Sequence, residues 1–415
     1  MAGIVLFGET LAAPKRYVQG THRTRHPRET LAEYRRHMPA LGITRLANVT
    51  GLDSIGIPVY VAVRPNARSL ATSQGKGLDP DAARASALME SIETWHAETI
   101  DNPVRWDSYH SLARAAGRGG DGVVDPRELP FYREPSTAAP GGWVLGFDVA
   151  GQVPCWVPLD AVTMNFVGTP ERGTELVRSS NALASGNHVL EAIVHALCEA
   201  IERDAESLWR LDPELHQVDL GSVADPSCRE VLERLTRAGV SAAAWDLTSD
   251  VGVPTYASAI LEPPDPSGMR SMGIHYGFGC HLAPEVALSR ALTEAVQTRL
   301  SYVSGSRDDL FREDYQRNRD PELVAGIWEE IASTASTATL AARPSLATDT
   351  FEGDLAALLA AVRRVGIERV VVVDLTRPSL GLPVVKVIVP GLEGPGGHVP
   401  GPRARRMMAR AEEAG

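Results

Sequence analysis

The sequence predicts an α+β fold, because strand-like and helix-like segments are both present and do not alternate strictly. The strand-like segments are short runs of apolar and β-branched residues at 57–64, 143–149, 254–260, 370–375 and 384–389. The longer segments have apolar residues at helical spacing, and they lie at 80–98, 188–210, 283–303 and 353–365.

The N-terminal region begins with a cationic arm. Residues 14–30 are rich in Arg, Lys and His, and they lead into a predicted helix at 28–38, where Pro27 and Glu29 suit a helix start. We expect residues 1–65 to form this arm with the first helix and strand, as an integral part of the fold. Residues 66–415 are then expected to form the main domain.

Three further regions are rich in residues that favour turns and loops. Residues 101–140 and 304–350 are enriched in Pro, Gly, Ser, Thr and Asp, so we expect insertions or long connections over the surface. The tail from Pro390 is rich in Gly and Pro and then becomes basic.

Composition excludes several classes of protein. The chain has 41 basic and 52 acidic residues, and a net charge of -11 argues against a nucleic-acid or anionic-membrane binder. No apolar run approaches the ~20 residues of a spanning helix, and no secretory signal is predicted. The four cysteines are widely spaced, which argues against a zinc site and favours a reducing cytoplasm.

One short pattern, A-L-x-E-x-(I/V)-(E/Q), occurs in three of the predicted helices. The copies are residues 87–93, 196–202 and 291–297. The pattern is also common in ordinary amphipathic helices. The alternative is that duplicated helices bring their carboxylates to one centre.

The carboxylates of two helices fall on narrow stripes. With about 100° per residue, Ser86, Glu90 and Glu93 share one stripe, opposite the apolar residues of that helix. Another stripe in the second helix holds Glu191, His195, Glu199 and Glu202.

Residues 86–98 and 188–202 contain no Lys or Arg that could offset the repulsion between these carboxylates. A solvated acidic face would explain one such helix. Two such helices favour a shared site for a hard cation such as Mg²⁺, which binds carboxylates and substrate phosphates.

Common nucleotide-binding motifs are absent from the sequence, which has no P-loop and no G-x-G-x-x-G after a strand. Lys76 lies between Gly75 and Gly77, immediately before the first acidic helix. The glycines could allow the backbone to approach a phosphate, to which Lys76 would add a charge. The alternative is an exposed lysine in a turn.

The combined spacing of these motifs resembles the YcaO family over nearly the whole chain, from about residue 20 to about residue 401. The matching positions are Gln74 to Gly77, Ser86, Glu90, Glu93, Asn181, Ala184, Gly186, Glu191, Glu199, Glu202, Arg203, Arg290, Glu294 and Gln297. The resemblance implies antiparallel and mixed sheets with helices that carry an ATP and Mg²⁺ site of non-Walker type.

The resemblance also implies a chemistry. A nucleophile attacks a peptide amide carbon, ATP phosphorylates the amide oxygen, and phosphate leaves. It assigns metal binding to Glu90, Glu93, Glu191, Glu199 and Glu202. It assigns ATP contacts to Arg23, Arg45, Lys76, Ser86, Asn181, Arg203, Arg290 and Glu294. It assigns catalysis to Glu191, Glu202 and Arg203.

Three segments resemble the thioamide-forming branch, whose members often work with a TfuA protein: residues 20–23, residues 42–58 and residues 389–393. Arg23 and Arg45 lie in these segments, and surface ion pairs would explain them equally well. The sequence ends without the proline-alternating tail typical of azoline-forming members, and no fused peptide-binding domain is evident. We therefore expect a separate TfuA-like partner, a sulfide source and a precursor peptide or protein as substrate.

Several alternatives remain open from the sequence. Azoline formation on Cys, Ser or Thr, amidine formation, or a non-catalytic ATP-binding scaffold would share the same motifs, and a homodimer is plausible. Cys198 lies near the second stripe and could carry sulfur, although a small buried core residue fits better. His195 and His275 could move protons, but they are first of all helix and strand residues.

Overall fold

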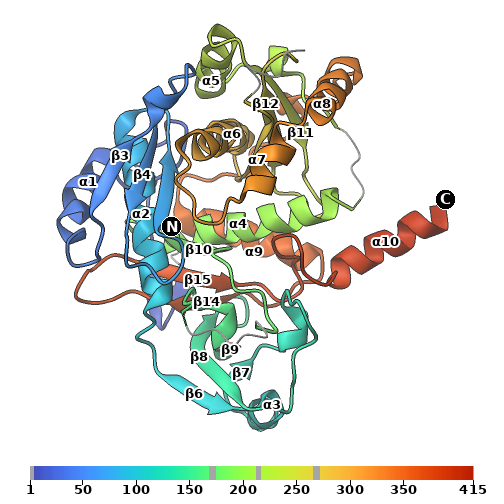
Figure 1. The fold of residues 1–415 in the computed structure, drawn as a ribbon. Helices are drawn as coiled ribbons and strands as arrows, with labels where there is room; N and C mark the ends of the chain where they lie inside the picture. Colours follow the sequence, from blue (N-terminus) through green and yellow to red (C-terminus); the bar gives the residue numbers. More distant parts are fainter. Residues whose placement is uncertain (1–3, 168–173, 212–215, 265–271, 415) are drawn as a thin grey trace.

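The computed structural model describes residues 4–167, 174–211, 216–264 and 272–414, and it has the predicted α+β fold (Figure 1). The chain opens with a hairpin of β1 (Ile4–Leu6) and β2 (Glu9–Leu11), and the arm then leads to α1 (Pro27–Tyr34). Pro27 and Glu29 lie in the first turn of α1, where the sequence predicts a helix start, and His26, which was not predicted, caps the helix.

The first of two similar units is a three-stranded antiparallel sheet with a helix packed on it. Its strands are β3 (Arg45–Asn48), β4 (Val59–Val63) and β5 (Thr72–Lys76), and its helix is α2 (Pro80–Glu98). A Cβ atom on Gly75 would lie 2.0 Å from the backbone N of Ala87. The glycine beside Lys76 therefore allows α2 to lie directly on β5, instead of exposing backbone to a phosphate.

The second unit repeats this arrangement later in the chain. It contains β11 (Ser241–Asp246), β12 (Thr255–Leu261) and β13 (His275–Cys280), followed by α6 (Pro284–Ser304). A Cβ atom on Gly277 would lie 2.3 Å from the backbone O of Ala291, so α6 packs on β13 as closely as α2 packs on β5. The helix α5 (Pro226–Arg237) packs beside α6.

A seven-stranded sheet forms the third part of the fold, beside the two similar units. Its order is β10 (Leu183–Ser185), β15 (Val384–Ile388), β14 (Val371–Asp374), β8 (Gly141–Asp148), β9 (Val153–Pro158) and β7 (Gly122–Val123), with β6 (Val104–Asp107) also paired to β8. All of these pairings are antiparallel except that of β7 with β9.

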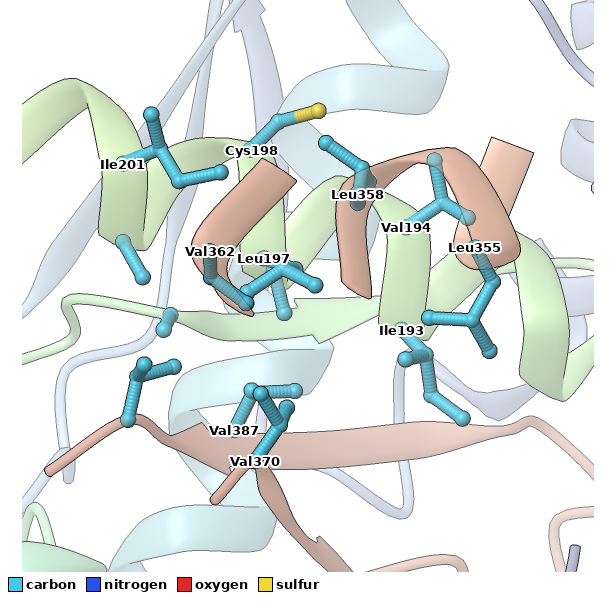
Figure 2. Packing of buried hydrophobic residues seen from close by; sticks show 14 of the residues in the cluster. Ile193, Val194, Leu197, Cys198, Ile201, Leu355, Leu358, Val362, Val370 and Val387 are labelled. Atoms are coloured by element: carbon cyan, nitrogen blue, oxygen red, sulfur yellow. The ribbon is translucent and has the colours of Figure 1, made fainter. Parts of the chain in front are cut away.

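The core between this sheet and two helices fixes the position of α4 (Val189–Trp209). Figure 2 shows Leu197 of α4 and Leu358 of α9 (Phe351–Arg364) packed with Val370 and Val387. Leu197, Leu358 and Val370 are fully buried. Each such side chain contributes roughly 1.5–3 kcal/mol through burial, so the carboxylate-bearing α4 rests on a well-packed support.

The two regions expected to be insertions or long connections over the surface contain regular structure. Residues 101–140 hold β6, α3 (Tyr109–Ala116) and β7, and residues 304–350 hold α7 (Arg312–Asn318) and α8 (Pro321–Ser333). The polar residues are helix caps, since Ser108 caps α3 and Asp320 caps α8. The basic tail forms α10 (Pro402–Ala414), which extends away from the body (Figure 1).

Candidate functional site

A cavity of about 620 Å³ lies among α2, α4, α6, β5 and the N-terminal arm. Its lining includes most of the predicted site residues: Arg23, Lys76, Ser86, Glu90, Glu93, Glu191, Glu199, Glu202, Arg203, Arg290 and Glu294. The structure thus brings together residues that are more than 250 positions apart in the sequence.

The three copies of the helix pattern contribute equivalent positions to this cavity. The first acidic position is Glu90 in α2, Glu199 in α4 and Glu294 in α6. The second position is occupied by Glu93, Glu202 and Gln297. The convergence predicted from the repeated pattern is confirmed, because these side chains all line one cavity.

Among the described residues, no basic side chain directly contacts Glu90 or Glu93, the two carboxylates of α2 that line the cavity. Glu93 Oε1 accepts hydrogen bonds from the backbone N of Ser185 at 2.8 Å and from its Oγ at 2.6 Å. Burial, with a smaller contribution from neighbouring Glu90, raises the pKa of Glu93 to about 8 although the hydrogen bonds from Ser185 oppose the shift. Glu90 lines the cavity and is exposed to solvent there. The protein atoms around it also raise the pKa of its carboxyl, because they reduce its hydration.

Two carboxylates of α4 are almost completely buried and held by backbone donors. Glu191 Oε2 accepts from the backbone N of Thr24 at 2.9 Å and from Thr24 Oγ1 at 2.6 Å. Glu202 Oε2 accepts from the backbone N of Cys280 at 2.8 Å, and its Oε1 accepts from Arg203 at 2.9 Å. Burial raises the pKa of Glu199, the third carboxylate of this helix, to about 7.

Basic side chains surround the carboxylates. Lys76 Nζ lies 2.6 Å from Glu294 Oε2, and Arg203 Nη2 lies 3.8 Å from Glu294 Oε1. Burial opposes ionisation of Glu294, but these two cations outweigh it and lower the pKa of the carboxyl. Arg290 donates to His195 Nδ1 at 3.1 Å, while burial and Arg290 lower the pKa of that histidine well below its usual value.

Two predicted ATP contacts do not line this cavity. Arg45 is exposed on β3, away from the carboxylates. Asn181 lines a separate cavity of about 60 Å³, where its backbone O accepts from the buried Lys386 at 2.6 Å.

Two other residues considered for chemistry, Cys198 and His275, lie outside the cavity lining. Cys198 is buried in the core between α4 and α9, in agreement with a small apolar role. His275 is buried on β13, where Nε2 lies 3.0 Å from the backbone O of Met272, and it does not line the cavity.

Sequence reasoning missed several residues that contact the carboxylates directly, and Thr24 and Ser185 make the shortest of these contacts. Thr24 lies in the cationic arm, and Ser185 lies between Ala184 and Gly186 in the second signature, so motif proximity could have indicated Ser185. No periodicity singled out Thr24, because the arm is neither a helix nor a strand at that point.

The cavity suits a hard divalent cation that is bound together with phosphate. Within the described residues, no three His, Cys, Asp or Glu side chains form a ready-made metal site. Mg²⁺ is usually held by one or two carboxylates, while water and substrate phosphates supply the other ligands. Partly buried carboxylates with raised pKa values, such as Glu93 and Glu199, fit this ion because its charge would favour their ionised form.

The fold and the cavity together define a class: an α+β protein whose cavity combines buried carboxylates with basic side chains, without a P-loop. A family profile described as "YcaO cyclodehydratase, ATP- and Mg²⁺-binding" matches residues 74–393. The chain belongs to the YcaO family, and it is therefore an ATP-dependent enzyme of this type, with ATP and Mg²⁺ as cofactors. The predicted family, enzyme class and cofactors are confirmed.

Two relatives match most of the chain. An uncharacterized protein of Methanothermobacter thermautotrophicus is 37% identical over 379 residues, which cover 88% of this chain and 94% of that protein. A protein of Rhizobium leguminosarum bv. trifolii, described as uncharacterized and in the tfuA 3′ region, is 36% identical over 380 residues. The match covers 88% of this chain and 87% of that protein.

Two solved structures share the fold. A heterocyclase in complex with substrate and cofactor superposes with a TM-score of 0.76 at 22% identity, covering 93% of this chain and 54% of that one. The YcaO protein of Methanopyrus kandleri, bound with AMPPCP and Mg²⁺, superposes with a TM-score of 0.71 at 24% identity. That match covers 92% of this chain and 95% of the other.

No helix in the described ranges combines the length and the apolar character needed to cross a membrane.

Proposed function

We propose that this enzyme forms a thioamide in the backbone of a ribosomally made peptide or protein, together with a TfuA-like partner. Hydrosulfide would attack the amide carbon, and the amide oxygen would accept the γ-phosphoryl group of ATP. Loss of that oxygen as phosphate, which also carries away the hydrosulfide proton, would leave a C=S group and ADP. The tfuA region in the name of the Rhizobium relative supports this branch of the family.

The single observation that carries the proposal is the joining of carboxylates from three repeated helices in one cavity with a basic rim. We assign Mg²⁺ binding, directly or through water, to Glu90, Glu93, Glu191, Glu199 and Glu202. Bound Mg²⁺ would neutralise phosphate charge and favour phosphoryl transfer.

The basic side chains and nearby hydroxyl are assigned to the nucleotide. Lys76, Arg23 and Arg290 would hold phosphate oxygens. Ser86, on the same side of α2 as Glu90 and Glu93, would donate a hydrogen bond to the nucleotide. Glu294 would keep Lys76 oriented through their 2.6 Å contact. Arg203, held between Glu202 and Glu294, would stabilise charge that develops on the transferring phosphoryl group.

The test is a reconstitution with the purified chain, a TfuA-like protein, a candidate precursor peptide, ATP, Mg²⁺ and sulfide. Mass spectrometry should detect replacement of one peptide oxygen by sulfur, and the product should be absent when ATP or sulfide is omitted. The Glu191→Gln variant should give no product. Formation of product without ATP would contradict the proposal.

Azoline formation is the second candidate, because the family description names a cyclodehydratase and one structural neighbour is a heterocyclase. In that reaction a Cys, Ser or Thr side chain of the peptide is the nucleophile, and the peptide loses one water. The same mass spectrometry experiment separates the two reactions, since only the thioamide reaction incorporates added sulfide.

A further inference from the structure

One wall of the cavity comes from residues that precede the match to the family profile. The family match begins at residue 74, yet Tyr17, Gln19, Thr21, Arg23 and Arg25 line the cavity. Residues 13–25, which comprise Ala13 and the first part of the cationic arm, therefore complete the site with residues that the family profile does not include. They are called the arm in this subsection.

The arm is fixed at its base to the start of α9. Lys15 Nζ lies 2.6 Å from Asp354 Oδ2, and both side chains are almost completely buried. The backbone N of Ala13 donates to Glu352 Oε2 at 2.9 Å. A buried ion pair with such a hydrogen bond beside it indicates a segment with a defined position on the protein surface.

The tip of the arm is a closed loop with its own constraints. Arg23 N donates to the backbone O of Tyr17 at 2.8 Å, and Tyr17 N donates to Arg23 O at 3.1 Å. Gly20 within the loop has φ +66, and a Cβ atom there would lie 2.3 Å from Leu78 Cδ1. The positive φ favours glycine at this position, and Leu78 of the segment that precedes α2 packs closely against it, so the loop lies against the cavity.

The loop ends at Thr24, which donates two hydrogen bonds to the same oxygen of Glu191. These bonds occupy Oε2 at 2.9 and 2.6 Å. Within the described part of the chain, the contacts of the other oxygen, Oε1, are longer: Arg23 Nε lies at 3.7 Å and Asn187 Nδ2 at 3.4 Å. Because Glu191 is 2% exposed, its carboxylate depends on these donors for its orientation.

We propose that Thr24 is a positioning residue that holds Glu191 with Oε1 directed to Mg²⁺–nucleotide. This inference rests on the proposed role of Glu191 and goes beyond it, since it gives the arm a defined task in the site. Removing the hydroxyl leaves Oε2 with one donor and allows the carboxylate to rotate. A hydrogen bond to a charged group is strong enough for its loss to weaken binding by about tenfold or more.

The test compares Thr24→Val with Thr24→Ser, which retains the hydroxyl. Calorimetric titration with AMPPCP and Mg²⁺ should show about tenfold weaker binding for the valine variant and near-normal binding for the serine variant. Thr10→Val, on exposed β2, is the matched control and should bind normally. Thermal unfolding without nucleotide shows whether each variant is folded.

A double-mutant comparison makes the assignment specific. Once Glu191→Gln is present, adding Thr24→Val should weaken binding little further, because both changes act through one carboxylate. Normal binding by Thr24→Val, equal damage from Thr24→Ser, or additive effects with Glu191→Gln would each overturn the proposal. Failure of the wild-type chain to bind the nucleotide would instead contradict the proposed function itself.

Discussion

Lys76 Nζ contacts Glu294 Oε2 at 2.6 Å, although the two residues are 218 positions apart in the sequence. Lys76 ends β5 of the first unit, and Glu294 lies on α6 of the second. The pair therefore joins the two similar units across the cavity. It also keeps a basic group beside Arg203, which contacts the other oxygen of Glu294.

Replacing Lys76 with Met should weaken ATP binding more than it lowers the turnover rate of the ATP-bound enzyme. The change removes a phosphate contact and leaves Glu294 with Arg203 as its remaining close cation. We expect the KM for ATP to rise about tenfold or more, corresponding to about 1.4 kcal/mol or more of lost interaction. Steady-state ATPase measurements at saturating Mg²⁺ would check this.

The matched control for this prediction is Arg84→Met. Arg84 is exposed on α2, pairs with Asp81 and lies outside the cavity, so its loss should leave the KM for ATP unchanged. An equal rise in KM for both variants would indicate a general charge effect and contradict the specific role of Lys76.

Neutralising Glu202 should abolish turnover without unfolding the protein. Glu202 is 2% exposed, and burial raises its pKa, so the ionised carboxylate is costly without a bound cation. We expect Glu202→Gln to lose at least about 100-fold in ATPase activity while its melting temperature without Mg²⁺ stays equal or rises. Glu230→Gln, on an exposed part of α5, should change neither quantity.

Melting curves with and without Mg²⁺–AMPPCP would complete this test. The wild type should be stabilised by the ligand, and Glu202→Gln should lose most of that stabilisation. A variant with normal ATPase activity would remove Glu202 from the proposed metal site.

The long elements and the acidic stripes could be predicted because their signals are local. The helix predicted at 80–98 coincides with α2, since Asp79 caps it and Pro80 occupies its first turn. The periodicity of 188–210 likewise identified α4 and placed Glu191, Glu199 and Glu202 on one side.

The short glycine-containing strands escaped prediction for a physical reason. Glycine lowers strand propensity, so Thr72–Lys76 and His275–Cys280 have weak local signals. Those glycines are required by the helices that pack on them, which is information from distant parts of the chain. The contact of Thr24 with Glu191 has the same origin, since 167 positions separate the two residues.

Acid should destabilise the protein below about pH 6.5, in part through His96. This residue is 1% exposed on α2; Nδ1 lies 2.7 Å from the backbone O of Ile92, and Nε2 has no hydrogen-bond partner among the residues that the structure describes. Burial lowers its pKa to about 4. The unfolded chain, with a pKa of about 6.5, binds the proton first, so stability is lost as the pH falls from about 6.5 towards 4.

The expected loss from His96 alone is about 2 kcal/mol between pH 7.5 and pH 5.0. Urea unfolding of His96→Leu at both pH values should show a smaller difference than the wild type by about that amount. His110→Leu, at an exposed position, should retain the wild-type difference. An unchanged difference in His96→Leu would contradict a neutral His96 in the folded protein.

Gly75→Ala should impair activity by moving a helix that carries two of the proposed metal ligands. The new Cβ atom would lie 2.0 Å from Ala87 N and 2.4 Å from Ala83 O, and both are backbone atoms that cannot rotate away. Helix α2 must therefore shift from β5, which displaces Glu90 and Glu93 relative to α4. We expect a stability loss of roughly 1–3 kcal/mol and at least about tenfold lower ATPase activity.

The control for the same chemical change is Gly326→Ala in α8, where nothing lies within 4 Å of the added Cβ atom. Alanine at that helical position should stabilise the protein by about 0.5–1 kcal/mol and leave activity unchanged, so the two glycine variants should differ in the sign of their effect on stability. Urea unfolding and ATPase assays on both would measure this. Full activity in Gly75→Ala would mean that the spacing of α2 and β5 does not control the carboxylates, because the substitution cannot be accommodated without changing that spacing.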